Sequence, residues 1–213
     1  MAVKPTSIIL CGGKELRFGR SKAAARVGGL TVMERVLDVL GPISGQILLV
    51  TAPGKREIET GGKATVVTDS YTGKGPLGGI HAGLSSAKSD VVIAVACDMP
   101  FLNATLLTRM LNMIDGFDAV VPRLSGEMVE PLHAIYSKSC LPEMKAWLER
   151  GELSLTRLLR TLHVRYVERE EYLPLDPRML SFFNINYPED FERANRIASA
   201  TDEEKQRLDT SSP

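Results

Sequence analysis

Short apolar runs, each long enough for one buried strand, alternate along the chain with segments that carry apolar residues at helical spacing. The strand-length runs in the first half are residues 8–11, 47–50, 64–68 and 91–96. Strands that are apolar on both faces are typical of parallel sheets covered by helices on both sides. The alternation therefore predicts an α/β fold, a three-layer α/β/α sandwich around a mostly parallel, Rossmann-like sheet.

The remaining segments extend this pattern to a single domain. We expect helices over residues 31–40, 103–114, 141–150 and 155–162. Another helix should follow the glycine-rich loop after Asp69 and end at about residue 88, and a last helix should begin at Pro188. Further strands are predicted at 118–122, 129–136, 164–167 and 182–186. Neither repeats nor a linker interrupt the 213 residues, so we predict one domain over 1–200 and a polar C-terminal tail over 201–213.

Composition excludes several classes of partner. Lys+Arg and Asp+Glu both number 26, which argues against nucleic acid or an anionic membrane as a partner. Cys11, Cys97 and Cys140 have no metal-ligand spacing and are expected to be reduced thiols. The sequence carries no signal-peptide pattern and no apolar run that could span a membrane. We expect a cytoplasmic protein that is a monomer or a weak oligomer.

The first apolar run leads directly into a glycine-rich, basic loop. Gly12 and Gly13 are followed by Arg17 and Lys22. Adjacent glycines present bare N–H groups to an anion, and the cations supply charge, so the loop indicates a phosphate cradle. The alternative is a tight strand-to-helix turn with solvated charges. The spacing does not fit the P-loop G-x-x-x-x-G-K-[ST].

Polar residues recur where the predicted strands end. Asp69 follows the third strand, Asp98 the fourth, and Asn184 and Asn186 lie on the late strand. The carboxyl ends of parallel strands meet at one edge of a sheet, so we expect these side chains to converge there. Asp98 either caps the next turn or holds Mg²⁺ together with phosphate oxygens. Asp69 either joins this site or accepts from backbone N–H groups of the loop after it.

Residues 73–78 match G-x-G-x-x-G, the dinucleotide-binding fingerprint of many dehydrogenases. Three residues separate its first glycine from the strand, and Pro76 removes an N–H group from the loop. We therefore favour a helix start at residues 75–79 that approaches a nucleotide closely, with Gly78 at the contact.

Four ordered motifs resemble the nucleotidyltransferase family that includes the molybdenum cofactor guanylyltransferases. The first is L-x-G-G-x-x-x-R-[MF]-G-x-x-K, which residues 10–22 fill in register, with Cys11 in place of the usual alanine. The others are G-P-L-G-G-I after Asp69, C-D-M-P-F around Asp98, and F-N-I-N-Y-P-E-D at 183–190. Residues 130–134, E-P-L-H-A, also resemble a strand of that family.

The resemblance implies a nucleotide-diphospho-sugar transferase-like fold and transfer of GMP from GTP to the terminal phosphate of molybdopterin, with release of pyrophosphate. It implies that Arg17 and Lys22 hold phosphates, and that Asp98 carries Mg²⁺ against the α-phosphate. Asn184 and Asn186 would contact the acceptor or complete the metal shell. The implied nucleotide site comprises Leu10, Cys11, Gly12, Gly13, Lys22, Thr51, Asp69, Gly78 and Asp98.

One departure leaves the choice of base open. Thr51 stands where the guanylyltransferases often carry an asparagine, and a hydroxyl cannot replace a two-sided amide. A related transferase that uses CTP or another triphosphate, with a different acceptor, remains an alternative. The other alternative is a binding protein that keeps the phosphate cradle but does not turn over.

Overall fold

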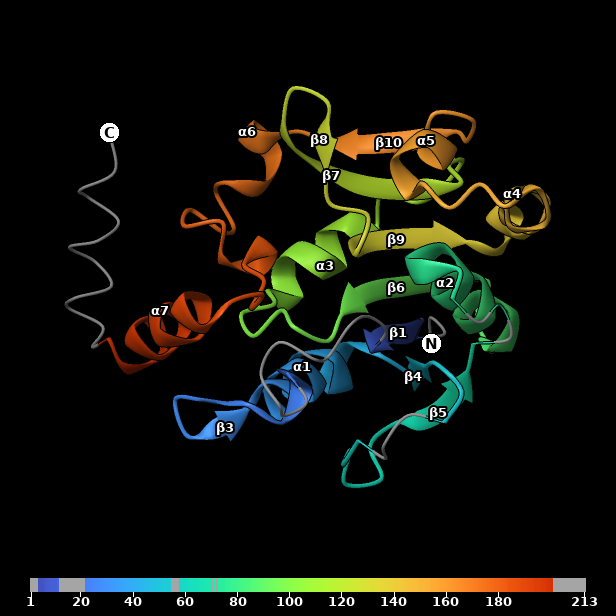
Figure 1. Cartoon of the computed structure of the whole chain (residues 1–213). Coiled ribbons are helices and arrows are strands. Elements are labelled where there is room, and N and C mark those ends of the chain that lie inside the picture. Colours follow the sequence, from blue (N-terminus) through green and yellow to red (C-terminus); the bar gives the residue numbers. More distant parts are fainter. Residues whose placement is uncertain (1–3, 12–21, 55–57, 70, 72, 201–213) are drawn as a thin grey trace.

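The computed structural model describes residues 4–11, 22–54, 58–69, 71 and 73–200. An eight-stranded sheet runs through the middle of the molecule in the order β10-β7-β9-β6-β1-β4-β5, with β8 paired to β7 (Figure 1). Its strands are β1 (Thr6–Cys11), β4 (Gln46–Thr51), β5 (Thr65–Thr68), β6 (Val91–Ala96), β7 (Ala119–Ser125), β8 (Met128–Val129), β9 (His133–Ser137) and β10 (Val164–Val167).

The sheet is mixed rather than wholly parallel. Strands β5, β4, β1 and β6 are parallel to one another, and β10 is parallel to β7. Strand β9 runs antiparallel to both β6 and β7. The expected mostly parallel sheet is thus confirmed, with antiparallel pairing confined to its second half.

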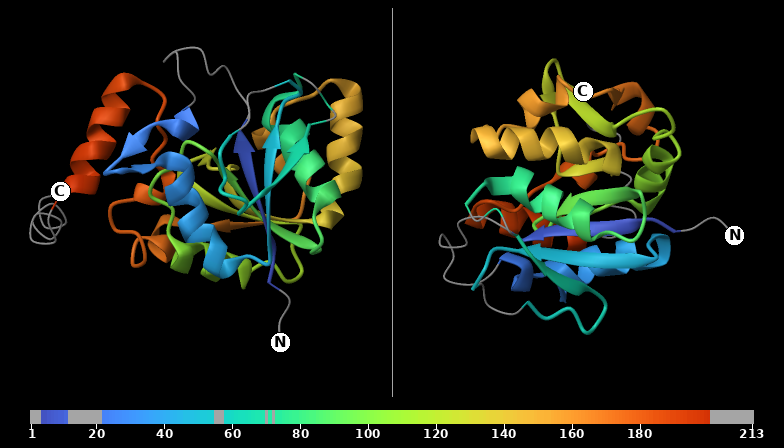
Figure 2. Two further views of the ribbon diagram at one scale, coloured as in Figure 1. Left: turned by 90° about the horizontal axis from the view of Figure 1, so that it is seen from below. Right: turned by 90° about the vertical axis from the view of Figure 1, so that its right-hand side faces the viewer.

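Helices cover both faces of the sheet, which confirms the three-layer sandwich (Figure 2). One apolar cluster joins the sheet to α2 (Gly75–Ser86), α4 (Leu141–Arg150) and α5 (Leu155–Leu159). The other joins it to α1 (Val32–Leu40), α3 (Ala104–Leu111) and α7 (Pro188–Ser199). The remaining elements are short: β2 (Arg26–Val27), β3 (Leu30–Thr31), α6 (Arg169–Tyr172), and the 3-10 helices η2 (Lys22–Ala24), η3 (Gly41–Ile43), η4 (Lys138–Cys140) and η5 (Leu180–Phe182).

Local sequence signals set several helix ends. Thr31 caps α1 in a capping box with Glu34, and the side chain of Asn103 accepts a hydrogen bond from the N–H of Leu106 at the start of α3. Gly151 ends α4 in the left-handed conformation that glycine adopts without strain. Pro188 begins α7 as predicted.

Two strand predictions are wrong. The strand predicted over 129–136 is divided into β8 and β9 by a turn, because Pro131 has no N–H to continue the ladder. Residues 182–186 form no strand: after η5 the chain crosses the end of β6, whose two neighbours are already β1 and β9. The helix predicted over 155–162 is shorter and ends at Leu159.

Every helix within the described ranges is too short or too polar to cross a bilayer, which takes about 20 mostly apolar residues.

Candidate functional site

The carboxyl ends of β1, β4, β5 and β6 lie side by side at one edge of the sheet. Cys11 on β1 is in register with Thr51 on β4, and Thr51 with Thr68 on β5. We call this edge, with the segments that follow these strands, the rim. Asp69 comes directly after β5 and Asp98 two residues after the end of β6, so both lie on it, as their place in the sequence predicts.

Asp69 is a buried carboxylate with local hydrogen-bond partners. Its N–H donates to the carbonyl oxygen of Thr51 at 2.9 Å, and its Oδ1 accepts from the N–H of Tyr71 at 2.8 Å. Burial raises the pKa of Asp69, against the opposing effects of the Tyr71 N–H and of His81. The expectation that Asp69 accepts from the loop after it is therefore confirmed.

Helix α2 lies close against this carboxylate through a glycine. A Cβ added at Gly78 would stand 3.0 and 3.1 Å from the two carboxylate oxygens of Asp69. The helix begins at the rim, its first turn carries no acidic residue, and the side chain at its N-cap position makes no capping hydrogen bond. Such a helix start offers backbone N–H groups to an anion.

Tyr71 and His81 complete this side of the rim, although the sequence did not mark them as site residues. Their rings meet edge to face, with centroids 5.2 Å apart. Burial lowers the pKa of His81, partly offset by the charge of Asp69. The Nδ1 atom of His81 is buried and has no hydrogen-bond partner within the described part of the chain.

Asp98 is linked to the segment that carries Asn184. The N–H of Ile185 donates to the carbonyl oxygen of Asp98 at 3.0 Å. The Nδ2 of Asn184 donates to the carbonyl oxygen of Phe182 at 3.3 Å. The predicted convergence of Asp98 and Asn184 is therefore present, although the strand expected to deliver Asn184 does not form.

Glu130 joins this group from the turn between β8 and β9. Its Oε1 accepts from the N–H of Leu132 at 3.1 Å. Burial raises the pKa of Glu130, and the charge of Asp98 raises it further, while the N–H of Leu132 and the side chain of Asn184 oppose the shift. Sequence reasoning placed Glu130 in a family-like strand but gave it no role. A carboxylate just before Pro131 was the only available signal.

Asn186 belongs to the same segment. It is exposed, and its N–H donates to Oδ2 of Asp190 at 2.9 Å at the start of α7.

The residues around Asp98 fit a magnesium ion that also binds phosphate. Mg²⁺ in proteins takes one or two carboxylates and completes its shell with water and phosphate oxygens. Asp98 and Glu130 supply carboxylates and Asn184 an amide. Across the described residues there is no group of three or more His, Cys, Asp or Glu that would hold a metal without such help.

Part of the predicted nucleotide site can be located and part cannot. Leu10 and Cys11 end β1 and are buried, and Thr51 ends β4. Lys22 begins η2, but its side chain lies outside the described atoms. Gly12, Gly13 and Arg17 lie outside the described residues, so their roles stay predictions.

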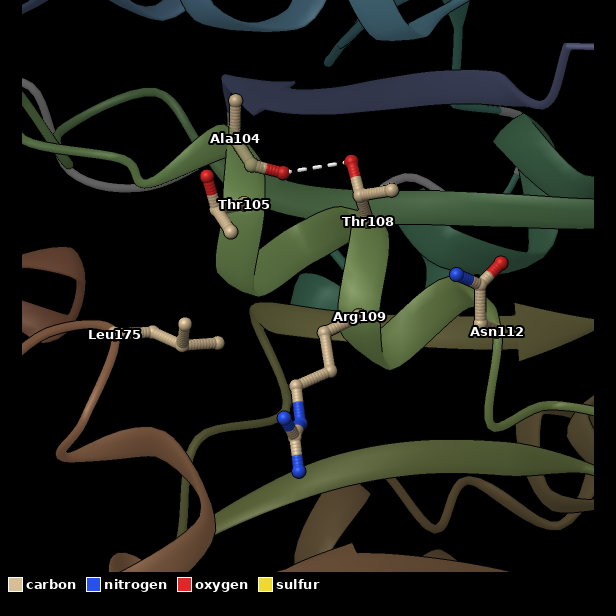
Figure 3. A pocket seen from close by; sticks show the side chains of 6 residues that line it. All are labelled: Ala104, Thr105, Thr108, Arg109, Asn112 and Leu175. Atoms are coloured by element: carbon tan, nitrogen blue, oxygen red, sulfur yellow. Dashed lines mark hydrogen bonds between the residues drawn. The ribbon is translucent and has the colours of Figure 1, made fainter.

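A hollow on the outer side of α3 does not have comparable chemistry (Figure 3). This cavity of about 460 Å³ is lined by Ala104, Thr105, Thr108, Arg109, Asn112 and Leu175. The hydroxyl of Thr108 already donates to the carbonyl oxygen of Ala104 at 2.7 Å. With one cation and no carboxylate in its lining, it lacks the features that the rim combines.

Comparison with known proteins places the chain in a family. Residues 7–167 match the model of a family described as the MobA-like NTP transferase domain. A probable molybdenum cofactor guanylyltransferase of Pelotomaculum thermopropionicum is 33% identical over 196 residues, covering 92% of this chain and 94% of that protein. The molybdenum cofactor guanylyltransferase of Desulfosudis oleivorans is 34% identical over 197 residues, covering 92% and 96%.

Solved structures give the same picture at the level of the fold. Molybdopterin-guanine dinucleotide biosynthesis protein A from Archaeoglobus fulgidus superposes with a TM-score of 0.76 at 30% identity, over 91% of this chain and 98% of that one. The 2-C-methyl-D-erythritol 4-phosphate cytidylyltransferase of Thermus thermophilus has a TM-score of 0.69 at 21% identity, over 93% and 100%. The second similarity concerns the fold alone.

Proposed function

Because this chain belongs to the family of MobA-like NTP transferase domains, we propose that it transfers GMP from GTP to the terminal phosphate of molybdopterin. The bond that forms joins an oxygen of the acceptor phosphate to the α-phosphorus of GTP. The bond that breaks joins the α-phosphorus to the bridging oxygen, and pyrophosphate leaves. The product is the guanine dinucleotide form of the cofactor.

One observation carries the proposal. Relatives with the name molybdenum cofactor guanylyltransferase match this chain over nearly the full length of both proteins. The same full-length match includes the segments that build the rim around Asp69, Asp98 and Asn184.

The two halves of the rim suit the two halves of the reaction. On the side of β4 and β5, Asp69, Gly78 and the start of α2 would hold the nucleotide, with the backbone of Leu10 and Cys11 beneath it. Arg17 and Lys22 would hold its phosphates, as the family motif implies. The transfer needs no covalent intermediate, so positioning and charge stabilisation dominate the rate.

On the side of β6 and β9, Asp98, Glu130 and Asn184 would hold the metal. A bound Mg²⁺ would supply Lewis acidity at the α-phosphate and neutralise charge on the leaving pyrophosphate. Asp98 would bind it directly, because a carboxylate at the end of a buried strand is held in place by the sheet. Asn186, exposed beside the start of α7, would contact the acceptor.

The thermal midpoint with GTP, CTP, ATP and UTP, each with and without Mg²⁺, tests the nucleotide. A ligand that binds only the folded state at 100 times its dissociation constant adds about 2.7 kcal/mol of stability. We expect a Mg²⁺-dependent rise with GTP alone. A rise with CTP alone would reassign the substrate and the branch of the family.

Product formation from purified molybdopterin and GTP then tests the acceptor. We expect one pyrophosphate for each guanine dinucleotide formed. Nucleotide binding without pyrophosphate release would identify a binding protein instead and overturn the proposal.

A further inference from the structure

Two phenylalanine rings pack against each other beside the end of β6. Phe101 follows Asp98 by three residues, and Phe183 directly precedes Asn184. The ring centroids are 5.8 Å apart with an interplanar angle of 61°, and both residues are only partly buried. Because the N–H of Ile185 donates to the carbonyl oxygen of Asp98, the two rings come from segments that are hydrogen-bonded to each other at the rim.

An arginine lies over each of these rings. The Cζ atom of Arg35, on α1, is 5.8 Å from the ring centroid of Phe101, and that of Arg193, on α7, is 5.4 Å from the centroid of Phe183. Both distances are within the range of a cation–π contact. Neither guanidinium forms an ion pair with a carboxylate in the described part of the chain. We call these four residues the arginine–phenylalanine cluster.

The hairpin of β2 and β3 holds the two arginine-bearing helices together, and α7 lies beside it (Figures 1 and 2). The Nε of Arg35 donates to the carbonyl oxygen of Val27 at 2.7 Å, and the N–H of Gly28 donates to Oδ1 of Asn195 at 3.1 Å. A Cβ added at Gly28 would stand 2.6 Å from Nη2 of Arg35 and 2.7 Å from Cβ of Ala198. The cluster is therefore held in place by close packing around this glycine.

The cluster has the chemistry of a site for a flat heterocyclic ring. Aromatic rings and guanidinium planes stack on such rings, while guanidinium N–H groups donate to ring nitrogen and oxygen atoms. Ligand sites combine aromatic walls with a few polar groups in this way. The alternative is packing alone, because both phenylalanines also contact the apolar cluster beneath α1, α3 and α7. Packing accounts for the rings, but not for two arginines at one place without acidic partners among the described residues.

The cluster also lies close to the end of β6, where the acceptor phosphate must react. Three residues of extended chain span at most about 11 Å, which limits the distance between the Cα atoms of Asp98 and Phe101. Molybdopterin carries its terminal phosphate one methylene group away from its fused rings. Rings and phosphate must therefore occupy neighbouring sites, as the cluster and Asp98 do.

We propose that the arginine–phenylalanine cluster binds the pterin ring system of the acceptor, with the acceptor's terminal phosphate at Asp98. This inference rests on the proposed function, since that function supplies the acceptor. It places the acceptor between α1 and α7, on the face of the sheet opposite to α2, whose start would hold the nucleotide.

Binding of a fluorescent pterin to the whole chain tests the proposal without turnover. The probe is hydroxymethylpterin phosphate, titrated with Mg²⁺ and a GTP analogue whose methylene group between the α- and β-phosphorus atoms prevents cleavage. The variants are F183L, F183Y, R193Q and R193K. The matched control is R150Q, because Arg150 lies 5.8 Å from the ring centroid of Trp147 on α4, at the other face of the sheet.

We expect F183L and R193Q each to weaken binding of the pterin phosphate about tenfold, because each removes one stacking surface. F183Y keeps the ring and should bind as the wild type does, whereas R193K keeps only the charge and should lose nearly as much as R193Q. R150Q should lose nothing. In the transfer assay the KM for molybdopterin should rise in the same pattern, while the KM for GTP stays within about twofold of its wild-type value.

The thermal midpoint of each variant reports whether it is folded, and R193Q, at an exposed position of α7, serves if F183L is not. The proposal is overturned if the pterin phosphate does not bind the wild type, or binds folded F183L and R193Q equally well. Full recovery in R193K would overturn stacking in favour of charge alone. Glycerol phosphate that competes as strongly as the pterin phosphate would show a site for phosphate without a site for the rings.

Guanylyl transfer, assayed on the same wild-type sample, distinguishes failure of this inference from failure of the proposed function. Transfer with an unchanged KM for molybdopterin in F183L and R193Q refutes only the inference. Pterin binding that is lost in these variants, in a protein without transfer, refutes only the proposed function.

Discussion

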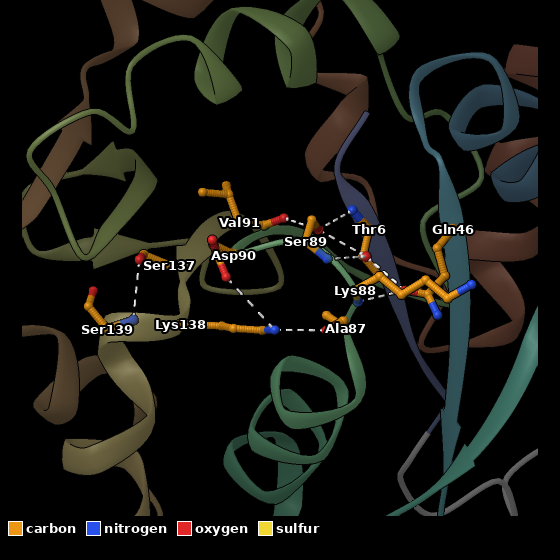
Figure 4. A network of polar contacts seen from close by, with 10 residues as sticks. All are labelled: Thr6, Gln46, Ala87, Lys88, Ser89, Asp90, Val91, Ser137, Lys138 and Ser139. Atoms are coloured by element: carbon orange, nitrogen blue, oxygen red, sulfur yellow. Dashed lines mark hydrogen bonds and ion pairs between the residues drawn. The ribbon is translucent and has the colours of Figure 1, made fainter. Parts of the chain in front are cut away.

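The two edges of the sheet use polar residues in opposite ways. At the amino-terminal edge, formed by the starts of β1, β4 and β6 and the end of β9, polar groups bind one another (Figure 4). Ser89 accepts from the N–H of Thr6 at 2.7 Å and donates to the carbonyl oxygen of Val91 at 2.7 Å. Gln46 accepts from the hydroxyl of Thr6, and Lys138 donates to the carbonyl oxygen of Ala87.

At the rim, by contrast, acidic groups face one another. The charge of Asp98 acts on Glu130, and burial raises the pKa values of both Glu130 and Asp69. Raised carboxyl pKa values mean that ionisation opposes folding here. The amino-terminal edge thus holds the strands together, whereas the rim brings together carboxylates that a bound cation would stabilise further.

The largest expected effect is on activity, at Asp98. We predict that D98N lowers Mg²⁺-dependent guanylyl transfer about 100-fold or more, because a bound metal contributes several kcal/mol to the transition state. The matched control is D90N at the amino-terminal edge, where Asp90 is exposed and 4.0 Å from Lys138. The comparison fails if the rates of the two variants, measured by pyrophosphate release, fall equally.

His133 provides the next largest effect, on stability in acid. This residue begins β9 near the rim, and burial lowers its pKa to about 4, against a smaller opposing effect of Asp176. Because the unfolded chain binds a proton at the ordinary value near 6.5, this contribution is complete above about pH 6.5 and is lost as the pH falls towards 4. We expect about 3 kcal/mol less stability at pH 4 than at pH 7 from this group.

Urea unfolding at the two pH values measures that difference. In H133L the drop between pH 7 and pH 4 should be smaller by the same ~3 kcal/mol, because leucine cannot take a proton. An undiminished drop in H133L would show that other groups cause the loss.

A methyl group added at each edge should change the free energy of unfolding by a smaller amount, and in opposite directions at the two edges. G78A places a Cβ about 3 Å from the carboxylate of Asp69, and overpacking of this kind costs about 1–3 kcal/mol. G41A adds its methyl where no atom lies within 4 Å and the φ is −52°, so it should stabilise by about 0.5 kcal/mol. Thermal unfolding checks both values, and only G78A should also weaken GTP binding.

The smallest effect is expected at Ser89. S89A removes the acceptor of the buried Thr6 N–H, which should cost about 1 kcal/mol in urea unfolding. Affinity for GTP should stay unchanged, because the lost bonds lie at the far edge. A weakened nucleotide site in folded S89A would contradict the separation of the two edges.

Much of the framework could be predicted from the sequence because its signals are local. Apolar runs mark β1, β4, β5 and β6 within a residue or two, and side chains at Thr31 and Asn103 start their helices. Parallel strands bring their carboxyl ends together, so the placement of Asp69 and Asp98 at one rim also followed.

The division of β8 from β9 and the loss of the late strand depended on pairing between distant segments. Pro131 marked a possible break, but only the packed sheet shows that β6 already has two neighbours and leaves residues 182–186 to cross its end. Strand propensity within a short window contains no information about which partner is already occupied.

The sequence by itself therefore determined the α/β alternation, the helix caps and the residue types at the rim. Tertiary structure alone decided that the charge of Asp98 acts on Glu130, that His133 is enclosed without a polar partner for its ring among the described residues, and that the N–H of Ile185 meets the carbonyl oxygen of Asp98. The physical reason is the distance along the chain over which each kind of interaction acts. Backbone preferences and caps act over a few residues, whereas a hydrogen bond between distant side chains exists only after hydrophobic packing has brought their elements together.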